Sequence, residues 1–223
     1  GEGSPSVKRL LSALALSLAM PAAASAAILV DDGTAGLYND GIGTALNGTD
    51  PFFVAPGAGD PTITLASAPD LAPAAAALGN WLSDPAAPGG AWSSGPVAIP
   101  SNWTVETETA IIYAIDGGTT GLTDVVASFG VDNGLAVWLN GTFVGGNQAP
   151  GGASSNEYSY TLGDLGAGTN YLQVLREDHG GGTGYTVEVT GDVAPIPLPA
   201  AGLLLAGALG AMGYGARRRR AAG

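Results

Sequence analysis

Glycine and proline interrupt the chain every few residues between about residues 27 and 192, and no long stretch there repeats apolar side chains at the helical period of 3.6. Where apolar residues recur, they alternate with polar ones, which is the period of a strand with one buried face. Short strands at roughly ten-residue spacing, with turns between them, are typical of an antiparallel sandwich. The pattern therefore predicts one all-β domain over residues 27–194, an antiparallel β-sandwich or jelly roll.

Individual elements follow from the same pattern. The longest alternating run is 103–115, in which Trp103, Val105 and Ile111 share one face while Glu106 and Glu108 point to the other. Shorter runs cover 29–30, 52–54, 62–65, 125–131, 158–160, 172–174 and 185–189. A short helix is expected within 71–82. The Asn-Gly pair at 140–141, between two apolar runs, predicts a two-residue type I′ hairpin.

The charges are unevenly distributed along the chain. All 19 acidic residues except Glu2 lie between residues 27 and 194, whereas Arg176 is the only basic residue there. A domain with this balance repels phosphate backbones and anionic lipid headgroups. Nucleic-acid binding is therefore excluded, and neutral ligands or divalent cations are the expected partners.

The N-terminal region reads as a secretory signal peptide over residues 1–26. Lys8 and Arg9 precede an apolar run at 10–20, a proline and a series of small residues. Ala24 and Ala26 fit an A-x-A site, so signal peptidase is expected to cleave after Ala26. Val7 stands directly before Lys8, and an alternative start codon there would leave residues 1–6 untranslated.

The C-terminal region, 195–223, has three parts in a fixed order. A proline-containing motif comes first, followed by the uncharged stretch 198–214, which is the short end of what spans a bilayer. A basic cluster follows and is expected to stay cytoplasmic while the acidic domain is exported. The motif and cluster residues are Ile196, Pro197, Leu198, Pro199, Ala200, Arg217, Arg218, Arg219 and Arg220. An ordinary permanent membrane anchor is the alternative.

This order resembles the PEP-CTERM sorting signals of Gram-negative bacteria, in the VPLPA variant with Ile196 in place of Val. The resemblance implies processing by an exosortase-type membrane transpeptidase. The chain would pass through an inner-membrane-anchored intermediate before surface attachment or release. It also implies an association with exopolysaccharide and extracellular matrix. A second resemblance covers residues 132–141 (DNGLAVWLNG), which look like a hairpin of galactose-binding-like jelly rolls, including glycosidase accessory domains. That resemblance implies the fold and assigns no binding residue.

Two sets of side chains are candidates for ligand contact. Arg176, Glu177, Asp178 and His179 precede three glycines, so they could form a polar loop whose backbone approaches a sugar closely. The alternative is an arginine paired with a carboxylate, followed by a simple turn. Trp92 is the tryptophan best placed to stack on a sugar ring.

Asp-Gly loops could also supply oxygen ligands to one structural calcium ion. The candidate ligands are Asp31, Asp32, Asp116 and Asp132, although aspartate beside glycine is also common in turns that bind no metal. No cofactor other than this calcium is indicated.

These features together predict an exported surface or matrix protein whose domain is non-catalytic and associated with polysaccharide. No serine-hydrolase motif is present, and no nucleophile is singled out. Two alternatives stay open, a secreted glycan hydrolase that uses a carboxylate pair and a purely structural matrix component.

Overall fold

The computed structural model describes residues 26–194 and residue 207. The predicted signal peptide and the sorting-signal residues lie outside this part of the chain and stay predictions. Within the described residues, no helix has the length and apolar character needed to cross a bilayer.

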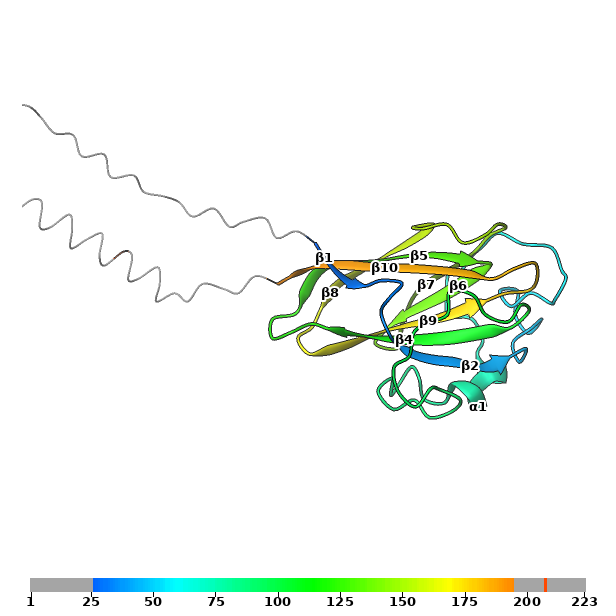
Figure 1. The fold of residues 1–223 in the computed structure, drawn as a ribbon, viewed down its shortest axis with the longest axis horizontal. Coiled ribbons are helices and arrows are strands. Elements are labelled where there is room, and N and C mark those ends of the chain that lie inside the picture. The colour runs from blue at the N-terminus through cyan, green and yellow to red at the C-terminus, as the bar shows by residue number, and fades with distance from the viewer. Residues whose placement is uncertain (1–25, 195–206, 208–223) are drawn as a thin grey trace, which may run out of the picture.

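The described residues form ten strands, which build two antiparallel sheets stacked as a sandwich (Figure 1). One sheet has the order β1-β10-β5-β8, and the other has the order β2-β4-β9-β6-β7-β3. The strands are β1 (Ala27–Val30), β2 (Leu37–Gly43), β3 (Ile63–Thr64), β4 (Glu108–Asp116), β5 (Leu122–Asp132), β6 (Gly134–Leu139), β7 (Thr142–Gln148), β8 (Tyr158–Leu165), β9 (Thr169–Glu177) and β10 (Gly184–Val193). The all-β antiparallel sandwich predicted from the sequence is confirmed.

The main core lies between the two sheets. Alternate residues of β4 and β5, such as Ile111, Tyr113, Val125 and Phe129, point into it and are buried. This is the arrangement that period-two alternation predicts.

A second core covers the outer face of the six-stranded sheet. The segment between β2 and β4 folds over this face and contributes Phe52, Phe53, Leu78 and Trp81, which pack with Trp138 of β6. The short helices in this segment are η1 (Ala72–Ala74) and α1 (Ala75–Leu78). Because both faces are covered, β4 and β9 are buried almost along their whole length.

The sandwich has two distinct ends. Ala27 at the start of β1 pairs with Gly191 near the end of β10, so the described chain enters and leaves at the same end (Figure 1). The other end, called the distal end below, gathers the start of β4, the end of β9 and the start of β10.

Of three local expectations from the sequence, two are wrong and one is confirmed. Residues 103–107 form a loop rather than the start of a strand, because the Trp103 indole donates to the Thr107 carbonyl (2.8 Å) and Glu106 has a φ of 63°. The short helix expected within 71–82 is confirmed by η1 and α1, which end at Gly79 with a φ of 58°. Residues 52–54 contribute one isolated bridge and two core phenylalanines instead of a strand.

The hairpin prediction is confirmed. Asn140 and Gly141 join β6 to β7 with φ values of 48° and 78°, and a type I′ turn requires positive φ at both central residues. The turn is also packed from outside, because a Cβ on Gly141 would meet the carbonyl oxygen of Leu82 in the covering segment.

Gly141→Ala is therefore expected to destabilise the domain more than the backbone conformation alone explains. Gly163 has nearly the same φ, 76°, but has no atom within 4 Å of the position of a Cβ. Gly163→Ala carries only the left-handed backbone cost of about 1–2 kcal/mol. Gly141→Ala should cost at least about 1 kcal/mol more because the backbone of Leu82 must move. Urea unfolding of both variants measures the difference, and equal losses would contradict the contact.

Candidate functional site

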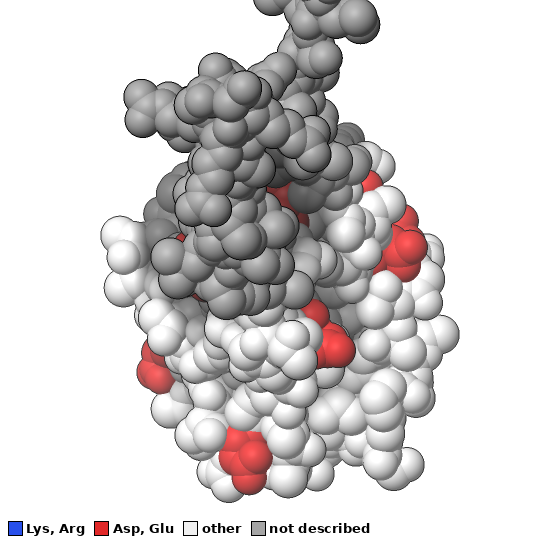
Figure 2. Space-filling model, turned by 90° about the vertical axis from the view of Figure 1, so that its left-hand side faces the viewer, with Lys and Arg blue, Asp and Glu red and all other residues white. Residues whose placement is uncertain are grey.

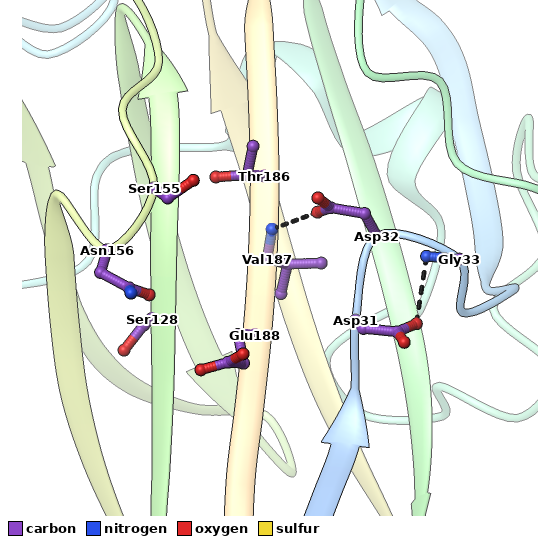
Figure 3. Close-up of a pocket in the computed structure, with 9 residues that line it drawn as sticks. All are labelled: Asp31, Asp32, Gly33, Ser128, Ser155, Asn156, Thr186, Val187 and Glu188. Atoms are coloured by element: carbon purple, nitrogen blue, oxygen red, sulfur yellow. Dashed lines mark hydrogen bonds between the residues drawn. The ribbon is translucent and has the colours of Figure 1, made fainter.

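An open polar hollow of about 330 Å³ lies against the outer face of the four-stranded sheet (Figure 3). Its walls come from residues 31–33, 128, 155–156 and 186–188, which belong to the turn after β1, to β5, to the turn before β8 and to β10. The lining side chains include three carboxylates, three hydroxyls and one amide. None of the lining residues is aromatic.

The carboxylates of the turn after β1 are held in place by the backbone. Asp31 Oδ1 accepts hydrogen bonds from the amide of Gly33 (3.1 Å) and the hydroxyl of Thr34 (2.8 Å). Asp32 Oδ1 accepts a hydrogen bond from the amide of Val187 (2.7 Å; Figure 3). Beyond the end of β1, the Asp32 side chain thus binds a backbone amide at the edge of β10 that no strand of the described chain pairs with there. One wall of the hollow is therefore fixed relative to the sheet.

The described surface around the hollow carries carboxylates and no exposed lysine or arginine. Arg176 is the only lysine or arginine among the described residues, and it is fully buried. The face drawn in Figure 2 accordingly shows acidic patches and no basic side chain among the described atoms. An anionic ligand would meet no counter-charge on this surface.

Arg176 lies inside the sandwich rather than in a ligand loop. Its guanidinium stacks 4.2 Å from the ring centroid of Trp103 and 4.8 Å from that of Tyr185, and its Nε donates to Thr109 (2.9 Å). No carboxylate of the described residues forms an ion pair with it. Neither the ligand loop nor its alternative, an arginine–carboxylate pair, describes Arg176, because aromatic faces take the place of the carboxylate.

Glu177, Asp178 and His179 are likewise buried, at the distal end and under the covering segment. The His179 ring lies between two carboxylates, with Nδ1 2.8 Å from Glu177 and Nε2 2.9 Å from Asp60. Gln148 of β7 donates to the second oxygen of Glu177 at 2.7 Å. A glycan could reach these groups only if the covering segment moved.

Glu108, at the start of β4, completes this buried cluster. It is fully buried, and within residues 26–194 neither of its carboxyl oxygens finds a hydrogen-bond partner. One oxygen of Asp178 and the side-chain oxygen of Gln148 are also without partners. A buried carboxylate without partners is costly, and such a group takes up a proton instead.

The acidities of these groups follow from their surroundings. Burial, reinforced by the charge of Glu177, raises the pKa of Glu108 to about 8. Burial also raises the pKa of Glu177 to about 7 and that of Asp178 to about 6. Burial would lower the pKa of His179, but the hydrogen bonds and charges of Glu177 and Asp60 outweigh it and raise this pKa. Carboxyl groups of this cluster therefore retain protons closer to neutral pH than exposed carboxyl groups do.

Trp92 is half-buried and packs within the second core. Its indole stacks on Trp81 with the ring centroids 5.9 Å apart, and its Nε1 donates to the carbonyl of Leu78 (2.9 Å). These contacts assign it a structural role in packing parts of the covering segment against one another.

The aspartates suggested as calcium ligands lie in different places. Asp31 and Asp32 border the hollow, Asp132 ends β5 at the distal end, and Asp116 ends β4 at the opposite end. Asp116 Oδ1 accepts from the amide of Gly118 (2.8 Å), as in an ordinary turn. Among the residues that the structure describes, no three His, Asp or Glu side chains are grouped so that they could hold a metal ion.

Sequence reasoning singled out Asp31 and Asp32 of the hollow and Glu177, Asp178 and His179 of the buried cluster, but it missed the other residues of both features. Ser128, Asn156 and Glu188 meet only because the turn before β8 lies beside the β5–β10 pair. Asp60 reaches His179 across a long stretch of sequence. Sheet register and the packing of loops on the sheets bring these groups together, and no local sequence pattern indicates this packing.

No protein-family model matches the chain, and no curated protein matches it. Among solved structures there is distant similarity to two proteins with β-sandwich domains. The PA14 sugar-binding domain from an RTX adhesin is 13% identical with a TM-score of 0.27, over 45% of this chain and 52% of that chain. The Podospora anserina GH26-CBM35 β-(1,4)-mannanase is 22% identical with a TM-score of 0.26, over 44% of this chain and 24% of that chain. Similarity at this level carries no argument about what this chain does.

The buried cluster predicts that stability falls as the pH rises. Because the pKa values of Glu108, Glu177 and Asp178 are higher in the folded than in the unfolded chain, the folded state binds more protons over this range. Each such group lowers the free energy of unfolding by about 1.4 kcal/mol per pH unit between its unfolded and folded pKa values. Thermal melts between pH 5 and pH 8 should show a declining midpoint.

The matched variant is Glu108→Gln, which keeps the shape of the side chain and removes its titration. It is expected to raise the melting temperature above that of the wild type at pH 8 and to change it little at pH 5. Asp84→Asn, at an exposed loop position, should keep the wild-type profile. Identical pH profiles for wild type and Glu108→Gln would show that Glu108 is not protonated on folding.

Proposed function

We propose that this chain is an exported, non-catalytic module that binds a hydroxyl-rich ligand of the glycan class in the polar hollow. The observation that carries the proposal is the lining of the hollow, in which carboxylate, hydroxyl and amide groups converge on an open surface (Figure 3). Sugar hydroxyls both donate and accept hydrogen bonds, and these groups supply acceptors and donors in return.

The negative charge of the domain disfavours anionic ligands and leaves neutral or cationic ligands as candidates. Asp31, Asp32 and Glu188 border the hollow, and the described surface offers no basic side chain to neutralise a sulfate, phosphate or uronate group. Since an anionic polymer would be repelled, neutral polysaccharide is the favoured class.

A binding role is favoured over hydrolysis by the position of the unusual carboxyls. The groups with raised pKa values, Glu108, Glu177 and Asp178, are buried at the distal end and do not line the hollow. Asp31 and Asp32 are engaged by backbone amides of the domain. Glycoside hydrolysis needs an acid and a second carboxylate on either side of a reachable bond.

The localisation is also part of the proposal. The signal peptide would direct export, and the Pro motif with the apolar stretch and Arg cluster would pass the chain to an exosortase-type transpeptidase. The domain would then act at the cell surface or in the extracellular matrix.

Binding is tested with neutral and anionic oligosaccharides on the full chain. Cellotetraose and chitotetraose represent neutral glycans, and oligomeric alginate represents an anionic one, with affinity measured by isothermal titration calorimetry. A neutral oligosaccharide is expected to bind, and alginate is not. Glu188→Ala should weaken binding roughly tenfold, the cost of one hydrogen bond to a charged group.

Asp84→Ala is the control, because Asp84 is exposed outside the hollow. It should leave the affinity unchanged. Equal losses of affinity in the two variants would show that the hollow is not the binding site. Tighter binding of alginate than of the neutral oligosaccharides would contradict the proposed ligand class.

Processing is tested by the intact mass of the protein in the culture medium and in the cell envelope of an exosortase-containing host. We expect an N-terminus at Ala27 and loss of Arg217–Arg220 from the surface form. A surface form that keeps the Arg cluster would contradict the sorting signal and support the permanent anchor.

A further inference from the structure

Residues 55–61, called the strap below, pass over the distal end of the six-stranded sheet without forming a helix or a strand. His179 contacts the strap at two points. The Gly57 amide donates to the His179 carbonyl (2.9 Å), and the Asp60 carboxylate lies 2.9 Å from Nε2 of the His179 ring. The strap is thus attached to the end of β9 through one residue.

The contact between the His179 ring and its two carboxylates requires an extra proton. A neutral imidazole has one N–H and can donate to only one partner, whereas both ring nitrogens lie within 2.9 Å of a carboxylate oxygen. Both hydrogen bonds form when the ring is an imidazolium or when one carboxyl is protonated. Without that proton, a lone pair of the ring faces a lone pair of a carboxylate.

The titratable side chains around His179 among the described residues are all carboxyl groups. They are Glu177 and Asp178 from the end of β9, Asp132 from β5, Asp60 from the strap and, behind Glu177, Glu108 from β4. The uncharged Gln148 of β7 approaches Nδ1 at 3.2 Å. Because no lysine or arginine among residues 26–194 pairs with these carboxylates, the ring proton is the positive charge that this part of the chain offers to hold them together.

The two carboxylates differ in how firmly they are held. Glu177 is fully buried and accepts a second hydrogen bond from Gln148, whereas the Asp60 side chain is 43% exposed. When the proton leaves, the Asp60 contact is the one that can break, because its carboxylate can turn into water. We propose that the strap is a proton-dependent closure, held by His179 in acid and released from the end of β9 as the solution becomes alkaline.

Release of the strap would change a second cavity. A cavity of about 560 Å³ lies beside residues 48–54 and includes Ala55, Gly59 and Pro61 of the strap in its wall. Movement of the strap therefore alters this wall and uncovers the buried end of β9. Access to this part of the molecule becomes dependent on pH, independently of ligand binding in the polar hollow.

The Gly57 amide reports the closure directly, because it donates to His179. Its hydrogen-exchange protection, measured by NMR on the full chain and normalised to the intrinsic exchange rate, should fall at least tenfold between pH 6 and pH 8.5. The amide of Val174, in the middle of β9, is the internal reference for opening of the whole domain. Gly57 should lose protection by a larger factor than Val174.

Two variants separate the proton from the fold. In Asp60→Asn the side-chain amide can donate to a neutral ring, so the protection of Gly57 should stay nearly constant over the same pH range. Asp84→Asn should behave as the wild type. The proposal fails if the protection of Gly57 does not depend on pH, if it falls only in parallel with Val174, or if Asp60→Asn keeps the wild-type dependence.

Discussion

Burial of both faces of the six-stranded sheet is the constraint on which the rest of the structure depends. A sheet in a simple sandwich needs cover on one face only, but here β4 and β9 carry apolar residues on both faces. The segment between β2 and β4 meets this need by placing Phe52, Phe53 and Trp81 over the outer face. The same cover extends over the polar residues at the distal end. The buried Glu108 and the buried His179 therefore follow from how the sheet is covered.

The distribution of charge follows from the same architecture. The one arginine of the described domain stacks on aromatic rings inside the sandwich, and the carboxylates that are not buried remain on the outside. A surface of one sign keeps anionic polymers away and leaves a hollow whose polar groups suit hydroxyls. At the distal end, protons take the role that counter-ions have elsewhere, because a buried carboxyl without a cation is stable only in its neutral form.

The sequence was sufficient for the fold class, for most strands of the second half and for the Asn140–Gly141 hairpin. Each of these depends on local signals, namely alternation along a strand and the positive φ that a type I′ turn requires. It was not sufficient for residues 103–107, where alternation continues but a loop forms around the indole of Trp103. It also placed Arg176 and Glu177 in an accessible loop. Glu177 is buried under the covering segment, which is far away in the sequence, and Arg176 is buried between the sheets against Trp103 and Tyr185. No local sequence pattern indicates either contact.

The pairing of Ala27 with Gly191 has a mechanical consequence. Because β1 and β10 run antiparallel and the described chain enters and leaves at the same end, a pull applied between the two termini separates this pair one rung at a time. When the domain is held at its C-terminal side alone, solvent drag does not pull β1 away from β10. The force then enters the domain through β10, which lies between β1 and β5. Tethering by one terminus therefore suits this topology better than stretching between both, and it points the distal end away from the point of attachment.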